Sequence, residues 1–200
     1  MLRPSDVTAC LVTRGDQPEM VERILETLLP YRSVIIWDNS VRDDRMVFGR
    51  YLAMSEAPTE VCYTQDDDCI VPPETQRALL NSYRPGGITS NYAHGDNDGG
   101  YGDLPMPPGG ALYAVVEAWV SIGAYRQEYG IDAWGRDEDA YADFVVGVLT
   151  PFQQIHAPFQ INVPVAQHPS RLCNQPWAAQ AKADVTGRAR KIRDRELAAA

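Results

Sequence analysis

Residues 61–73 have the sequence VCYTQDDDCIVPP, and the rest of the chain is best interpreted outward from this stretch. A short β-prone run leads to three adjacent aspartates, Asp66, Asp67 and Asp68, and a second apolar run ends at two prolines. Neighbouring anions repel one another, so holding them close together costs free energy unless a cation is bound. Carboxylate oxygens are suitable ligands for a hard divalent ion such as Mn²⁺ or Mg²⁺. The alternative is an acidic turn that caps a helix beginning near Pro73.

The chain before this cluster predicts an α/β fold. Three short apolar runs are expected to be strands, and two stretches with helical spacing separate them: strands over residues 7–13, 33–37 and 60–64, and helices from Asp16 and over residues 45–54. Asp16 is the expected N-cap of the first helix, and Glu19 completes a capping-box pattern. This alternation predicts a mostly parallel central sheet flanked by helices.

Polar residues follow each of the three expected strands. Thr13 and Arg14 follow the first, Asp38 and Asn39 the second, and the aspartate cluster follows the third. In open α/β sheets, ligands bind beyond the carboxyl ends of parallel strands. We therefore expect these residues to form one site at one edge of the sheet.

Composition indicates an ordinary globular domain. The chain has 200 residues, of which 44% are hydrophobic and 22% are charged, and no apolar run approaches the length needed to span a bilayer. The first residues show no signal-peptide pattern, and the four cysteines lack CxxC spacing. Reduced core thiols and a cytoplasmic protein are the expectation.

The net charge of −9 is unevenly distributed along the chain. Residues 177–200 contain six basic and three acidic residues, so they carry +3, and the preceding 176 residues carry −12. A body this acidic disfavours nonspecific binding to nucleic acid. We expect one domain over residues 1–176 and a basic tail over residues 177–200 that is helical or frayed.

Two later segments contain further candidate residues. Asp137, Glu138 and Asp139 stand at the start of an expected helix, where acidic residues also interact favourably with the helix dipole. His168 and Arg171 follow a last strand expected over residues 160–165.

Taken together, four features resemble a glycosyltransferase with the GT-A fold. They are the first strand with Thr13-Arg14, the strand end over residues 36–39, the acidic segment 66–74 and the acidic segment 138–145. The last three most resemble the exostosin-like enzymes of family 64, with family 2 next, and the likeness covers residues 7–172. The chain departs from the exostosin pattern in a much shorter acceptor half. It also has Asp38 before Asn39, as family 2 often does, in place of two asparagines.

The resemblance implies a UDP-sugar donor and a bound Mn²⁺ or Mg²⁺. Asp68 would be the direct metal ligand, and Asp66 would contact the ribose or reach the metal through water. His168 would be a late metal ligand, and Arg171 would stabilise the leaving diphosphate. The residues implied to hold the nucleotide are Thr13, Arg14, Asp38, Asn39, Asp66 and Asp67, with the Asp38 carboxylate accepting the uracil N3–H.

The resemblance also places Asp139, with Glu138 beside it, against the acceptor and the reacting sugar. The acceptor would be a hydroxyl group of a glycan, a protein or another molecule. Exostosin-like enzymes retain the anomeric configuration and family 2 enzymes invert it, and retention is the expectation here.

Two alternatives stay open. A noncatalytic module that binds nucleotide sugars would keep Asp38 and the aspartate cluster without needing Asp139. A metal-dependent nucleotidyltransferase would usually carry a glycine-rich, lysine-bearing loop after the first strand. Residues 13–18 contain one glycine and no lysine, which disfavours that class.

Overall fold

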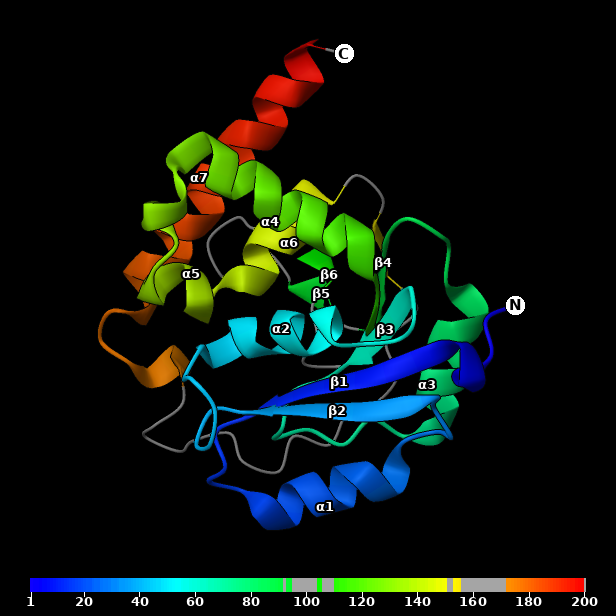
Figure 1. The fold of residues 1–200 in the computed structure, drawn as a ribbon. Coiled ribbons are helices and arrows are strands. Elements are labelled where there is room, and N and C mark those ends of the chain that lie inside the picture. Colours follow the sequence, from blue (N-terminus) through cyan, green and yellow to red (C-terminus); the bar gives the residue numbers. More distant parts are fainter. Residues whose placement is uncertain (92, 95–103, 106–109, 151–152, 156–171, 200) are drawn as a thin grey trace.

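The computed structural model describes residues 1–91, 93–94, 104–105, 110–150, 153–155 and 172–199. Its centre is a six-stranded sheet with the order β2-β1-β3-β7-β4-β8 (Figure 1). The strands are β1 (Val7–Thr13), β2 (Ser33–Asp38), β3 (Val61–Thr64), β4 (Ile88–Ser90), β7 (Ala111–Ala114) and β8 (Gln153–Ile155). β7 runs antiparallel to β3 and β4, whereas the other neighbouring strands are parallel. The predicted mostly parallel sheet is confirmed.

Helices cover both faces of this sheet (Figure 1). One face carries α1 (Pro18–Thr27) and α3 (Pro73–Ser82). The other side carries α2 (Gly49–Ser55), α4 (Val115–Tyr129), α5 (Arg136–Ala140), α6 (Ala142–Leu149) and α7 (Ala178–Ala199). Short pieces complete the described chain: the two-stranded ribbon β5 (Ala93–His94) and β6 (Leu104–Pro105), and the 3₁₀ turns η1 (Pro4–Asp6), η2 (Met46–Phe48), η5 (Ile131–Ala133) and η6 (Leu172–Asn174).

Strand β1 shows why the sequence folds into these layers. All seven of its residues are buried, and successive side chains point to opposite faces of the sheet. Leu11 packs with Ile24 of α1 on one face, and Cys10 packs with Tyr51 of α2 on the other. Burial on both faces explains why β1 is apolar along nearly its whole length.

The first helix begins later than the sequence indicates. α1 starts at Pro18, and its N-cap, Gln17, makes no capping bond through its side chain. Proline is well suited to the first turn of a helix because it needs no amide partner there. Asp16 lies outside the helix and forms an ion pair with Arg14 at 2.5 Å. The predicted N-cap at Asp16 is therefore wrong.

The C-terminal segment forms α7, and most of this helix packs against the body. Its buried residues recur every three or four positions and face α6, among them Ala181, Val185, Ala189 and Ile192. Beyond Ile192 the helix projects from the molecule (Figure 1), and Leu197 is 69% exposed. None of the helices in the described ranges combines the length and the apolar character that crossing a bilayer requires.

Candidate functional site

The structure brings the polar residues after β1, β2 and β3 together at one edge of the sheet. Thr13 is in register with Asp38, and the Asn39 amide donates to the Thr13 carbonyl at 2.9 Å. The Arg14 amide reaches Oδ2 of Asp67 at 3.4 Å and thereby joins the first strand end to the aspartate cluster. In Figure 1 the carboxyl ends of β1 and β2 point to the left. The edge site expected from the sequence therefore exists as a cluster of residues.

The aspartates of this cluster influence one another. Asp68 is buried, with 9% of its surface exposed, while Asp66 and Asp67 are partly buried. Burial raises the pKa of Asp67, and the charge of Asp66 raises it further. Hydrogen bonds from the Thr13 side chain and the Arg14 backbone act in the opposite direction. The crowding of negative charge predicted for residues 66–68 is thus present in the fold.

Asp38 and Asn39 are engaged in shaping the loop after β2. Oδ1 of Asp38 accepts hydrogen bonds from the amide of Ser40 at 2.8 Å and from its hydroxyl at 2.6 Å. The Asn39 side chain donates to the Met46 carbonyl at 3.1 Å and accepts from the Arg45 amide at 3.0 Å. This double link fixes the loop that carries Arg45 beside the strand ends.

Arg50 is a site residue that the sequence reasoning missed. It lies on α2, is only 1% exposed and donates from Nη2 to Oδ1 of Asp66 at 2.5 Å. Its Nη1 lies 3.6 Å from Oδ2 of Asp143 on α6. Burial opposes a charged Arg50, but the charges of Asp143 and Asp66 raise the pKa of its guanidinium above the ordinary value. The aspartate cluster therefore lies against an internal cation.

Asp143 was also missed, although it belongs to the second acidic segment. The hydroxyl of Tyr51 donates to Oδ1 of Asp143 at 2.7 Å. Burial raises the pKa of Asp143 to about 6, against the opposing effects of Arg50 and the Tyr51 hydrogen bond, and the charge of Asp66 adds to the rise. Through Arg50, the structure connects Asp143 to the aspartate cluster.

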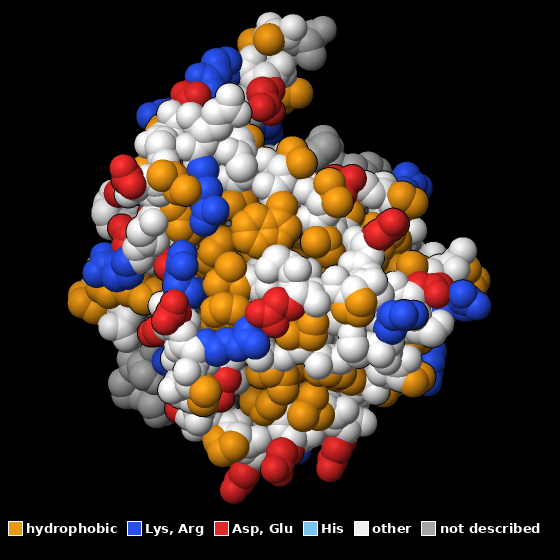
Figure 2. All heavy atoms as spheres, viewed as in Figure 1, with side chains coloured by type: hydrophobic (Ala, Val, Ile, Leu, Met, Phe, Trp, Pro, Cys, Tyr) orange, Lys and Arg blue, Asp and Glu red, His pale blue; other side chains and the backbone are white. Residues whose placement is uncertain are grey.

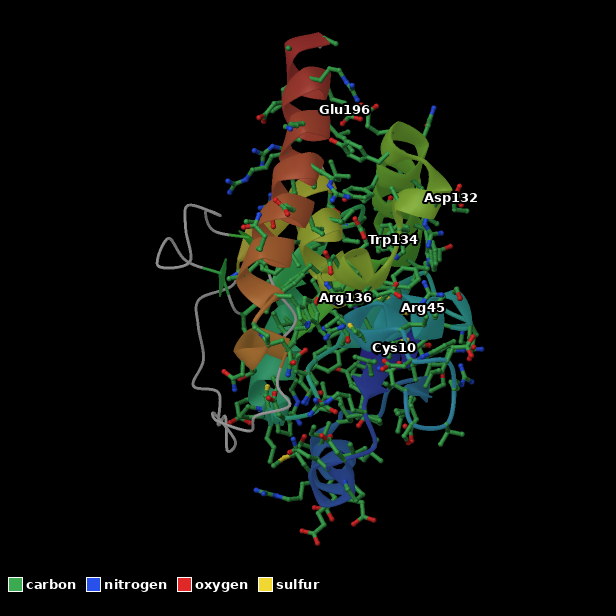
Figure 3. All side chains as sticks on the ribbon, turned by 90° about the vertical axis from the view of Figure 1, so that its left-hand side faces the viewer. Cys10, Arg45, Asp132, Trp134, Arg136 and Glu196 are labelled. Carbon is green, nitrogen blue, oxygen red and sulfur yellow. The ribbon has the colours of Figure 1, made fainter. Side chains whose placement is uncertain are left out.

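Asp139 is held on another side of the site. It is 9% exposed, and Arg45 grips both of its oxygens, with Nε at 2.8 Å and Nη2 at 2.9 Å. The indole Nε1 of Trp134 donates to Oδ1 at 2.9 Å. Figure 3, which views the molecule from the left-hand side of Figure 1, labels Arg45 and Trp134. The carboxylate is therefore fixed by three donors from two different segments.

Glu138, its neighbour, faces the C-terminal helix. Its Oε1 accepts from Arg188 at 2.7 Å and from the Tyr125 hydroxyl at 3.1 Å, and Oε2 accepts from the Gly135 amide at 3.1 Å. The residue is 4% exposed. These contacts connect α5 to α4 and α7, which is a structural arrangement.

A second arginine lies beside the Arg45–Asp139 pair. Arg45 and Arg126 both stack on the Phe48 ring, at 5.1 and 5.4 Å from its centroid, and Arg126 also lies 4.7 Å from the Trp134 ring. Burial lowers the pKa of Arg126, and the charge of Arg45 lowers it further. Figure 2 shows Lys and Arg side chains gathered next to hydrophobic ones on this face. Acidic side chains lie among them in Figure 2, and Arg45 itself is paired with Asp139.

A divalent cation fits the donor set at the strand ends as a partial site. Asp66 and Asp68 supply hard oxygen ligands, and substrate phosphates and water commonly complete such coordination. Within the described ranges, no three His, Cys, Asp or Glu side chains are grouped as a complete metal site. His168 and Arg171 lie outside the described residues, as does the strand expected over residues 160–165.

Comparison of this geometry with solved structures identifies the fold. A mannosyltransferase, PcManGT from Pyrobaculum calidifontis, solved in complex with GDP-Man and Mn²⁺, matches all of this chain and 78% of its own length, with a TM-score of 0.52 and 13% identity. The chain has a glycosyltransferase fold. A glycosyltransferase involved in glycosylating the major capsid of PBCV-1 matches 94% of this chain and 98% of its own, with a TM-score of 0.46 and 11% identity.

The sequence itself gives no such match. No protein-family model matches the chain, and no curated protein matches it at a significant level. The comparison with solved structures therefore confirms the fold class predicted from the sequence, and the residue roles and the substrates are matters for proposal.

Proposed function

We propose that this protein is a metal-dependent glycosyltransferase that transfers a sugar from a nucleotide sugar to an acceptor hydroxyl. The observation that carries the proposal is the aspartate cluster at the carboxyl edge of a glycosyltransferase fold, where Asp67 is joined to the end of β1 through Arg14. The nucleotide would lie against Thr13, Arg14, Asp38 and Asn39, and the diphosphate would lie toward Asp66 and Asp68.

Asp68 is the proposed principal ligand of Mn²⁺ or Mg²⁺, as the resemblance implies. One oxygen of Asp66 accepts a hydrogen bond from Arg50, which leaves its other oxygen for water or ribose. When bound, the ion would neutralise the negative charge that develops on the leaving diphosphate. His168 and Arg171 are proposed to contribute from the segment that follows β8. Asp66 is proposed to contact the ribose or to reach the metal ion through a water molecule.

The proposed donor is a UDP-sugar, with Asp38 as the residue that reads the base. Its Oδ1 is engaged by Ser40, and its second oxygen is the proposed acceptor for the uracil N3–H. Guanine also presents an N–H to a carboxylate, and GDP-Man is the nucleotide sugar in the complex of the Pyrobaculum enzyme. GDP-sugars are therefore the competing donor class, whereas cytosine offers an acceptor at that position and leaves the carboxylate unpaired.

We propose retention of the anomeric configuration, in the manner of the exostosin-like enzymes. Both oxygens of Asp139 are bound to Arg45, and one also accepts from Trp134. A general base needs an oxygen in hydrogen-bond reach of the acceptor proton. With both oxygens engaged, Asp139 has no oxygen committed to removing a proton, so its proposed role is electrostatic, with Arg45 offsetting part of its charge.

The deciding experiment measures hydrolysis and transfer with a panel of UDP-, GDP- and CDP-sugars, each with Mn²⁺ and with excess chelator. The expected result is turnover of UDP-sugars that requires the metal, and the anomeric configuration of the product is then determined by NMR. Binding of nucleotide sugars without turnover would instead support a binding module. No binding and no turnover with any donor would overturn the proposal.

A further inference from the structure

Arg50 lies between two carboxylates that come from different parts of the chain. Asp66 follows β3, and Asp143 is on α6, yet both lie within 4 Å of the same guanidinium group. Among the basic residues that the structure describes, Arg50 is the only one classed as buried. Its Nε and Nη1 atoms are fully covered and find no hydrogen-bond partner among the residues that the structure describes. This cation is thus held mainly by charge, not by a complete hydrogen-bond network.

Burying an arginine costs free energy unless carboxylates lie close enough to compensate its charge. Removing one member of a buried ion pair is strongly destabilising, because the remaining charge is left uncompensated. Here Arg50 offsets part of the charge of two carboxylates, those of Asp66 and Asp143, and Asp66 belongs to the aspartate cluster. A divalent cation at the strand ends would offset the same negative charge.

From this arrangement we infer that Arg50 is the internal counter-ion of the aspartate cluster and sets its affinity for a divalent metal. Arg50 holds Asp66 in place when no metal is bound. Its positive charge also repels a metal ion at the cluster and weakens the attraction between that ion and the aspartates. Asp143 has the opposite effect, because its negative carboxylate partly offsets the positive charge of Arg50. Arg50 and Asp143 are positioning residues and do not themselves contact substrate. The inference rests on the proposed function only in taking the cluster as the metal site.

The two residues should therefore shift metal affinity in opposite directions. Arg50→Met removes a competing cation and is expected to tighten Mn²⁺ binding. Asp143→Asn removes a supporting anion and is expected to weaken it, each by on the order of tenfold for charges interacting at partly screened distances. The double variant Arg50→Met with Asp143→Asn restores the net charge and should bind Mn²⁺ about as the wild type does. A purely structural role would loosen the site in both single variants.

The experiment is calorimetric titration of the chelator-treated protein with MnCl₂ at pH 8, without nucleotide. Thermal unfolding with and without Mn²⁺ is measured on the same samples. The metal should raise the melting temperature of Arg50→Met by more than it raises that of the wild type. Arg50→Lys, which keeps the charge, should return the affinity toward the wild-type value. If the single variant Arg50→Met does not fold, three variants still test the inference. Asp143→Asn should bind Mn²⁺ more weakly than the wild type, whereas the double variant and Arg50→Lys should bind it about as the wild type does.

Two outcomes would overturn the inference. One is a shift of Mn²⁺ affinity in the same direction in both single variants, or in neither of them. The other is no Mn²⁺ binding by the wild type. Neither outcome decides the proposed function, because sugar transfer is measured separately. Transfer that persists in excess chelator would support the glycosyltransferase activity and contradict its metal dependence. Opposite affinity shifts without any transfer would support the metal site and contradict the glycosyltransferase activity.

Discussion

At the scale of single residues, carboxylates of similar appearance in the sequence have different environments in the fold. Asp66 is paired with a buried arginine, whereas the arginine paired with Asp139 is one-third exposed. Asp143 accepts a hydrogen bond from a tyrosine hydroxyl in the core. Glu138 belongs to the contacts between helices. The environment of each group determines which can act on a ligand, and substitutions at these positions should have distinct effects.

Asp68→Ala should abolish Mn²⁺ binding and sugar transfer while leaving the fold intact. Asp68 is buried and follows Asp66 and Asp67 directly in the chain, so its removal also lowers the local negative charge, and the melting temperature in chelator should stay close to that of the wild type. Calorimetry with MnCl₂ and thermal unfolding test both points. Asp67→Asn is the matched control, since an amide oxygen can still accept from the Arg14 backbone, and it should weaken Mn²⁺ binding far less. Normal metal binding by Asp68→Ala would contradict the assignment.

Asp139→Asn should bind the nucleotide sugar normally and lose on the order of 100-fold in kcat, the scale of groups that act in the transition state. Arg45→Met is the matched variant, because it breaks the same ion pair and leaves the carboxylate in place. If the carboxylate itself acts on the sugar, Arg45→Met should retain much more transfer than Asp139→Asn. Equal losses in steady-state assays would instead show that the pair serves only to hold the structure.

At the scale of elements, α2 is packed closely enough on the sheet to require glycine at its first position. A Cβ atom on Gly49 would lie 2.5 Å from Cδ1 of Trp37 and 2.9 Å from Cγ2 of Val12. Arg50, the next residue, reaches Asp66, which follows β3. Helix placement and site geometry are therefore coupled through one small residue.

Gly49→Ala should destabilise the protein by roughly 1–3 kcal/mol, because the added methyl group forces the helix away from rigid neighbours. Gly123→Ala in α4 is the control: its Cβ would meet nothing within 4 Å, and removing a helix-interior glycine should stabilise by roughly 0.5–1 kcal/mol. Urea unfolding of both variants measures the difference. Equal stabilities would mean that α2 adjusts without cost.

At the scale of the whole molecule, the buried charge of Asp143 makes stability depend on pH. Its pKa is raised from 3.8 to about 6 in the folded protein, chiefly by burial, with Arg50, Tyr51 and Asp66 as the facing groups. Between about pH 4 and pH 6, Asp143 is therefore protonated in the folded protein and ionised in the unfolded chain. The stabilisation is fully present below about pH 4 and is lost as the pH rises through about 6.

Asp143→Asn should remove this pH dependence, because the amide does not titrate. The unfolding free energy of the wild type relative to this variant should fall between pH 4 and pH 7 by up to roughly 3 kcal/mol, given about 1.4 kcal/mol per pKa unit. Urea unfolding in chelator at several pH values gives this difference directly. Parallel pH profiles for the two proteins would assign the dependence to other groups.

The sequence by itself determined the order of strands and helices along the chain and the edge at which polar residues collect. Both follow from local patterns: apolar runs of β-prone residues, helical spacing, and the rule that parallel strands present their carboxyl ends together. The cluster over residues 66–68 and the pairs at residues 13–14 and 38–39 were found this way. The first helix was misplaced at its start, because an acidic residue near a proline resembles a cap in sequence whether or not it makes one.

Only the tertiary structure decided which charges face one another. Arg45 and Asp139 are 94 positions apart, and Tyr51 and Asp143 are 92 apart, so no local spacing relates them. Arg50 is one arginine among many in the sequence, and nothing around it indicates burial. Its partners are fixed by how α2 and α6 pack on the sheet, since the energy of a charge depends on the dielectric and the neighbours around it and not on its own identity.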